Sequence, residues 1–108
     1  MTQAQDIMSL LATLQSELTR LGYWETERPS VEALSSQQPF CVDTLAFNQW
    51  LQFIFIERIQ ALVDQGMALP NGSGLLPLAE EFFKQDDNTV LLKIIEDIDN
   101  TLGRALNS

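Results

Sequence analysis

The chain contains no histidine and a single cysteine, Cys41. Histidine is the side chain best suited to proton transfer near neutral pH, and it is the usual base beside a nucleophilic serine or cysteine. A lone cysteine forms no disulfide within the chain, so we expect Cys41 to be a small buried apolar side chain. These absences remove the common parts of hydrolase and transferase sites.

Long apolar runs are also missing. The longest unbroken run covers residues 53–56, whereas a membrane-spanning helix needs about 20 apolar residues. The N-terminal residues 1–6 lack the basic and then apolar layout of a signal peptide. We therefore expect no membrane partner and a cytoplasmic location.

Basic residues are scarce: six Lys and Arg face fifteen Asp and Glu, which gives a net charge of −9. Binding to nucleic-acid backbones depends on Lys and Arg displacing counterions, so this balance opposes direct nucleic-acid binding. The same charge favours docking on a basic surface, including that of an RNA-handling enzyme. The composition therefore indicates a protein partner.

The acidic residues form no recognisable reactive pattern. Several are adjacent, as in Asp86 with Asp87 and Glu80 with Glu81, and neighbours on a helix do not face each other. No loop has the alternating carboxylates, central glycine and closing glutamate of a calcium site. We expect no catalytic residue, no cofactor and no metal.

What the chain does have is an aromatic segment. Five of its nine aromatic residues lie between Phe40 and Phe55, and only Gln52 interrupts the apolar run 50–56. A helix that is apolar nearly all round must be covered on several sides. We predict a central helix that begins at Asp43 as its cap and ends near Gln65, with Gly66 as the stop.

Three further helices are predicted. Apolar residues recur every three or four positions from Ile7 to Leu21 and from Leu91 to Leu106, which predicts helices near 3–21 and from residue 89 onward. Thr2 and Gln5 suit a capping box for the first of these helices, and 86–89 suit the start of the last. A shorter helix is expected to have Pro77 in its first turn and to last to about Gln85, with Leu78, Phe82 and Phe83 as its buried face. The predicted fold is all-α, a four-helix bundle forming a single domain over residues 1–108.

A long connection joins the first two predicted helices. Between residues 23 and 42 the helical period is lost, and Ser30 suits a cap for one helical turn, 31–34. Connections of about 20 residues in a small domain usually pack over it or serve a function. We expect a partly ordered segment, anchored by the following apolar side chains: Tyr23, Trp24, Val31, Leu34 and Phe40.

Two polar residues sit where apolar ones are expected. Arg58 has apolar neighbours three and four positions away, so it must reach solvent or pair. We expect an ion pair with an acid on another helix or in the connection; the alternative is contact with a partner. The buried amide of Gln52 can be satisfied by the connection. Trp24 and Trp50 suit the core or, alternatively, a partner contact.

Several residues together resemble the YqcC-like family of small bacterial proteins. The candidate motif residues are Trp24, Pro39, Phe40, Asp43, Thr44, Trp50, Gln52 and Arg58. The resemblance implies a compact helical bundle of uncharacterised function, whose gene often neighbours that of a tRNA pseudouridine synthase. It implies no catalytic role for these residues.

Two functions are compatible with this pattern. The first is a non-catalytic interaction or accessory module associated with tRNA pseudouridine modification, which docks on a protein such as an RNA-modifying enzyme through a rim around Trp24, Phe40 and Arg58. The alternative is a binder of a small apolar molecule held between the second and fourth helices.

Overall fold

The computed structural model describes residues 3–69, 74–84 and 88–103, and within these ranges the regular secondary structure is helical, with no β-strand. The longer helices are α1 (Gln3–Arg20), α4 (Ile56–Asp64), α5 (Leu75–Phe82) and α6 (Thr89–Gly103). The shorter ones are α2 (Val31–Leu34), η1 (Pro39–Cys41), α3 (Phe47–Trp50) and η2 (Leu51–Phe55). Because α3, η2 and α4 follow one another without a break, they form one long helix, which we call the aromatic helix. The predicted all-α bundle of four main helices is confirmed.

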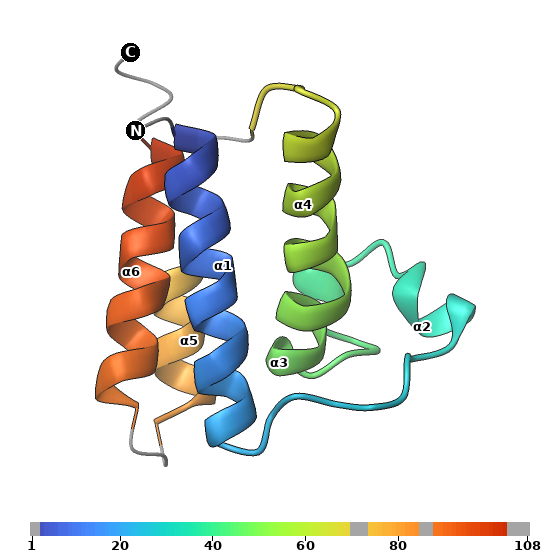
Figure 1. Cartoon of the computed structure of the whole chain (residues 1–108). Helices are drawn as coiled ribbons and strands as arrows, with labels where there is room; N and C mark the ends of the chain where they lie inside the picture. Colours follow the sequence, from blue (N-terminus) through green and yellow to red (C-terminus); the bar gives the residue numbers. More distant parts are fainter. Residues whose placement is uncertain (1–2, 70–73, 85–87, 104–108) are drawn as a thin grey trace.

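The main helices alternate in direction, and α1 lies alongside α6 while α5 packs behind them (Figure 1). Near the start of α1 the Gln3 amide donates to the Thr101 carbonyl of α6 at 2.8 Å. The buried faces of both helices carry the apolar stripes that the sequence predicts, with Ile7, Leu14, Ile95 and Ile98 fully buried. The pairing of α1 with α6 therefore forms one side of the core.

The sequence predicted that the aromatic helix lies at the centre of the bundle, and this prediction is wrong. The helix faces α1 and α5 on one side, while the connection and α2 lie on its outer side (Figure 1). Phe53 is nonetheless only 8% exposed, and the Arg28 guanidinium of the connection lies 5.7 Å from the centre of its ring. The long connection, rather than a third helix, covers the outer apolar face.

A wide helical turn explains how so many adjacent residues of this helix are buried. Across η2 the Ile56 N–H bonds to the Leu51 carbonyl five residues back, which is the spacing of a π-helix. The extra residue in the turn spreads side chains over more directions than an α-helix does. Leu51 can therefore face the bundle while Gln52 and Phe53, both buried, face the connection.

The aromatic helix begins four residues later than predicted. Asp43 is not its cap; the first helical residue is Phe47, and the Ala46 N–H before it is accepted by the Gln49 side-chain oxygen at 2.8 Å. The chain is still turning at Asp43, because the Thr44 and Leu45 N–H groups bond back to the Cys41 carbonyl. The predicted end is confirmed at Gly66, which has a φ of 66°.

The buried face of α5 also differs from the prediction. Leu78 and Phe82 are each 38% exposed, whereas Leu75, Ala79 and Phe83 are buried. These three are spaced four residues apart, so the helix turns a different stripe toward the core. Thr2, Gln85, Asp86, Asp87, Ala105 and Leu106, which entered the predicted caps and stripes, lie outside the described residues.

Candidate functional site

A pair of left-handed residues shapes the end of the connection. Phe40 has φ 57° and ψ 19°, and Cys41 has φ 52°. Each non-glycine residue in this conformation costs about 1–2 kcal/mol, so the surrounding contacts must hold it. The Phe40 ring packs 4.8 Å from Trp50 and 6.5 Å from Phe47, centre to centre. Cys41 is 6% exposed, as predicted for a small buried side chain.

Two of the motif residues hold this part of the connection in place. The Thr44 hydroxyl donates to the Ala33 carbonyl at 2.7 Å, which ties α2 to the turn before α3. The Asp43 carboxylate accepts from the Ser36 hydroxyl. The helical turn α2 itself is capped as predicted, because the Ser30 hydroxyl accepts from the Ala33 N–H. Asp43 and Thr44 thus have structural hydrogen bonds.

Amide side chains on the aromatic helix fix the start of the connection. The Gln52 amide bonds twice to the backbone of Glu25, which confirms the partner expected for it. Asn48 donates to the Tyr23 carbonyl at 3.1 Å, and Gln49 donates to the Glu25 carboxylate at 3.2 Å. Asn48 and Gln49 were not among the predicted site residues. Their signal in the sequence is that, with Gln52, they place three amides on a mostly apolar helix.

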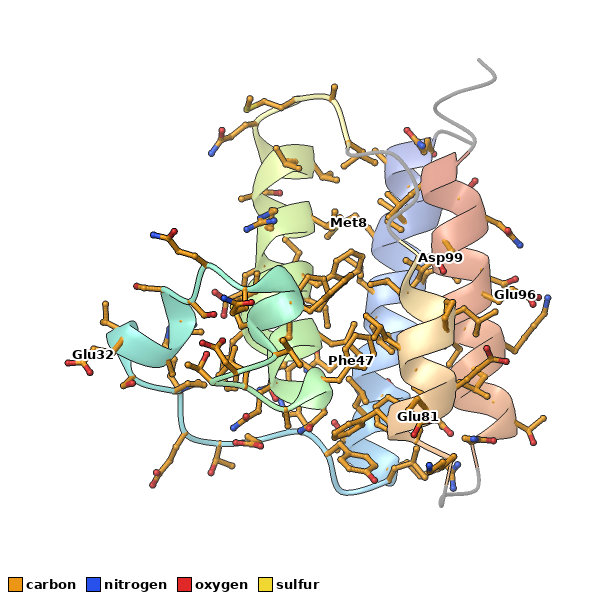
Figure 2. The ribbon with its side chains drawn as sticks, turned by 180° about the vertical axis from the view of Figure 1, so that it is seen from behind. Met8, Glu32, Phe47, Glu81, Glu96 and Asp99 are labelled. Carbon is orange, nitrogen blue, oxygen red and sulfur yellow. The ribbon has the colours of Figure 1, made fainter. Side chains whose placement is uncertain are left out.

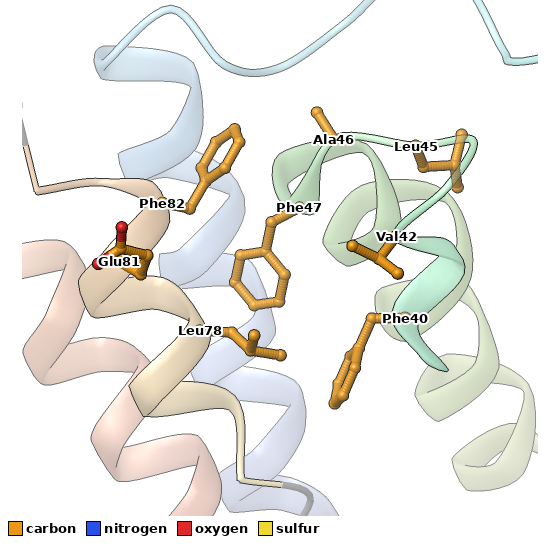
Figure 3. Close-up of a pocket in the computed structure, with 8 residues that line it drawn as sticks. All are labelled: Phe40, Val42, Leu45, Ala46, Phe47, Leu78, Glu81 and Phe82. Carbon is orange, nitrogen blue, oxygen red and sulfur yellow. The ribbon is translucent and has the colours of Figure 1, made fainter. Parts of the chain in front are cut away.

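An apolar groove opens between α5 and the segment that leads into α3 (Figure 3). We call it the Phe47 groove; its volume is about 380 Å³. Phe47 lies in the middle, with Leu78 and Phe82 of α5 on one side and Val42 and Phe40 on the other. The described residues that line it are Phe40, Val42, Leu45, Ala46, Phe47, Leu78, Glu81 and Phe82. The two α5 side chains that the prediction placed in the core therefore line this groove instead.

Seen from behind, Phe47 points toward the helices of the other half of the molecule, whereas Glu32 of α2 points outward (Figure 2). Val31 beside it is 80% exposed, so its predicted role as an anchor is wrong. Tyr23, Trp24, Leu34 and Phe40 do pack against the core as predicted.

A second groove brings three motif residues together. We call it the Arg58 groove; its volume is about 350 Å³, and it shares Phe40 with the Phe47 groove. Its lining is Leu34, Ser36, Gln38, Phe40, Cys41, Trp50, Ile54 and Arg58. A cavity of about 470 Å³ beside it also has Leu34, Ile54 and Arg58 in its wall. The Arg58 groove and this cavity thus follow the seam between the connection and the aromatic helix.

The prediction of an ion pair for Arg58 is wrong for the part of the chain that the structure describes. Arg58 is exposed, and none of the described carboxylates pairs with it. The neighbouring Glu57 instead holds Arg28 through two hydrogen bonds of 2.7 and 3.0 Å. This carboxylate raises the pKa of Arg28, first by hydrogen bonding and then by its charge. The pairing fastens the connection and leaves Arg58 in the grooves.

The other predicted site residues lie elsewhere. Trp24 is half-buried against the core and lines neither groove that contains Phe40. Pro39 is the first residue of η1. Of the predicted rim, the structure therefore brings together Phe40 and Arg58 but not Trp24.

Across residues 3–69, 74–84 and 88–103, no three His, Cys, Asp or Glu side chains gather where they could hold a metal ion. No helix within these ranges has the length and apolar character needed to cross a bilayer.

These features define a small helical domain with surface grooves at the seam between a long connection and an aromatic helix. The chain belongs to the DUF446 family, whose description is tRNA pseudouridine synthase C and whose match covers residues 6–101. The resemblance to YqcC-like proteins is confirmed by the relatives that follow.

An uncharacterized protein of Haemophilus influenzae is 43% identical over 75 residues, which are 69% of this chain and 71% of that protein. The uncharacterized protein YqcC of Escherichia coli K12 is 28% identical over 101 residues, 92% of this chain and 93% of that one. The solution NMR structure of E. coli YqcC matches with a TM-score of 0.83 at 26% identity, covering 95% of this chain and 90% of that chain. The fold is therefore shared with E. coli YqcC.

A different kind of relative is the tRNA pseudouridine synthase C of Pectobacterium carotovorum. It is 33% identical over 70 residues, which are 65% of this chain but only 19% of that protein. Most of that protein thus lies outside the region of similarity.

Proposed function

We propose that this chain is a non-catalytic accessory module that binds a tRNA pseudouridine synthase of the C type. The observation that carries the proposal is the relative of that name, in which a region similar to this chain makes up 19% of a longer polypeptide. Domains joined in one polypeptide work side by side. A separate chain of the same kind can act at the same place by binding.

The charge of the chain supports binding to the enzyme rather than to its RNA. A net charge of −9 repels phosphate backbones and attracts the basic surface that an RNA-binding enzyme presents. The proposal assigns no catalytic residue to this chain, because the motif residues Asp43 and Thr44 already hold the connection in place. A cytoplasmic location belongs to the same proposal.

The test is a titration of the purified chain with tRNA pseudouridine synthase C from the same organism, at low and at raised salt. We expect a complex that weakens as salt rises, because screening reduces attraction between surface charges. Pseudouridine formation in tRNA, measured with and without the chain, then shows whether binding changes the activity of the enzyme. The absence of binding at low salt would count against this function.

A second candidate is a binder of a small apolar molecule, and the Phe47 groove favours it. Its volume of about 380 Å³ lies within the range of small-molecule sites, about 300–1,000 Å³, and among the described residues that line it only Glu81 is charged. The groove lies between α5 and α3 rather than between the two helices predicted for a ligand. A thermal-shift panel of lipids and metabolites tests it; a stabilising compound that loses its effect in Phe47→Ala supports this candidate.

A further inference from the structure

Among the Lys and Arg residues in the described ranges, Arg58 is the one without a carboxylate partner. Each other Lys or Arg in the described ranges has a carboxylate partner: Arg20 with Glu17 at 2.6 Å, Arg28 with Glu57 at 2.7 Å, Lys84 with Glu81 at 2.8 Å and Lys93 with Asp97 at 3.0 Å. Fifteen acidic residues are available in the chain for six basic ones. The lack of a described partner for Arg58 is therefore not caused by a shortage of acids.

Two carboxylates close to Arg58 or its groove already have other hydrogen-bond partners. Glu57, next to Arg58 in sequence, forms its two hydrogen bonds with Arg28. Asp43 accepts from Ser36, whose side chain lines the Arg58 groove. The guanidinium therefore lies in a groove that supplies no negative charge of its own among the described residues, and its five N–H donors are suited to a carboxylate from outside.

The rest of the groove indicates what accompanies that carboxylate. Leu34, Ile54 and Trp50 give it apolar walls, while Gln38 adds an amide. A volume of about 350 Å³ is at the lower end for small-molecule sites, about 300–1,000 Å³, and is enough for one side chain with part of its neighbour. An acidic side chain next to an apolar one matches both the charge and the walls.

We propose that the Arg58 groove receives an Asp or Glu side chain, flanked by an apolar residue, from the protein partner. This rests on the proposed function, because the partner is taken to be the synthase. An RNA phosphate also suits an arginine, but a net charge of −9 opposes it. The overall acidity brings a basic enzyme near, and Arg58 then supplies one contact of the opposite sign that fixes the orientation.

The first arm of the test compares variants in the synthase titration. Arg58→Gln removes the charge and is expected to weaken binding about tenfold or more, since a hydrogen bond to a charged group is typically worth about 1.5–3 kcal/mol. Arg58→Lys should be intermediate, because a lysine loses the two-pronged geometry. Lys93→Gln makes the same change in net charge on α6 and should bind as the wild type does. Arg58 is exposed, so each variant should fold, which circular dichroism verifies.

The second arm needs no synthase. Phenylacetate is titrated into the labelled chain while the Nε–H signal of Arg58 is followed by NMR, with neutral phenylacetamide as the matched control. We expect the carboxylate to move the Arg58 signal at millimolar concentration and the amide to move it much less. No shift with either compound, or equal shifts with both, overturns the carboxylate site.

The two arms separate the possible failures. If wild type and Arg58→Gln bind the synthase equally well, the inference is overturned and the proposed function stands. If the wild type does not bind the synthase, the proposed function fails, and the phenylacetate titration decides whether Arg58 receives a carboxylate. Binding of tRNA to the chain alone that is lost in Arg58→Gln also overturns the inference.

Discussion

The side chain of Gln52 forms two hydrogen bonds with the backbone of Glu25: its oxygen accepts from the Glu25 N–H at 2.9 Å and its nitrogen donates to the Glu25 carbonyl at 2.8 Å. The two residues are 27 positions apart in the sequence. This pair imitates the pairing of two strands, with one side chain acting in place of a second backbone. It attaches the start of the connection to the aromatic helix at a buried position.

Replacing Gln52 with Leu should therefore cost more than the loss of a surface amide. The variant leaves the Glu25 N–H and carbonyl without their partner. A fully buried unsatisfied group costs about 1–3 kcal/mol; because these two groups are only partly buried, we expect the free energy of unfolding to fall by about 2–4 kcal/mol in total. Urea denaturation measures it. Gln60→Leu, on the same helix, should change stability by less than about 0.5 kcal/mol. Equal effects in the two variants would contradict the role given to Gln52.

Asp99 of α6 caps α5 from outside that helix. Its carboxylate accepts from the Leu75 N–H at 3.1 Å and from the Leu76 N–H at 2.9 Å, which are donors with no partner inside the helix. Asp99→Ala should lower the free energy of unfolding by about 1–2 kcal/mol, as for other lost caps. Asn100→Ala, at an exposed neighbouring position, is the control in thermal denaturation. A neutral Asp99→Ala would show that the cap is not formed in solution.

The Glu17–Arg20 pair predicts how stability depends on pH. Glu17 is 7% exposed, and the hydrogen bond from Arg20 lowers its pKa, helped by the charge of Arg20 and opposed by burial. A carboxyl group with a lowered pKa in the folded state stabilises above its unfolded pKa, and this contribution is lost as pH falls through the folded value. Arg20→Gln should therefore be less stable than wild type at neutral pH.

The gap between these two proteins should close as the pH falls through the acidic range below about 4.3, the ordinary pKa of a glutamate. Urea titrations at a series of pH values measure it. Arg28→Gln is the comparison, since it loses an exposed pair that fastens the connection. If the difference in stability between wild type and Arg20→Gln does not shrink across this acidic range, the assignment is wrong.

Cys41 should react slowly with thiol reagents in the native protein. Its side chain is almost fully buried beneath the turn that begins at Phe40, so a reagent must wait for local opening. Labelling with Ellman's reagent should be slow in buffer and complete in urea. Rapid native labelling would mean that the left-handed turn opens readily.

Helical periodicity predicted α1 and α6 well, because each carries one apolar stripe against a neighbour, as Leu14 and Ile95 illustrate. The start of the aromatic helix was missed for a physical reason. Left-handed φ values are usual for glycine or asparagine, and nothing local in Phe40 or Cys41 indicates them. Packing of the Phe40 ring on Trp50 holds a conformation that local preference opposes.

The site shows the same division between local and long-range information. The misfit of Arg58 on an apolar helix was visible in the sequence, as was the need of Gln52 for a partner. The pairing of Glu57 with Arg28 was not, because the two residues are 29 positions apart and meet only after the connection has folded back. The Phe47 groove also depends on which face of α5 is exposed. The spacing of Leu78 and Phe82 in the sequence does not show that their side chains lie on this exposed face.

The segment between Tyr23 and Ala46 differs from an ordinary surface loop in what its removal would do. Protein engineers often trim long loops to gain stability, since a shorter loop loses less entropy on closing. Here the trimmed protein would lose the cover over Phe53 and the backbone partners of Gln52 and Asn48. The apolar outer face of the aromatic helix would then be exposed to water, and we expect the shortened chain to aggregate.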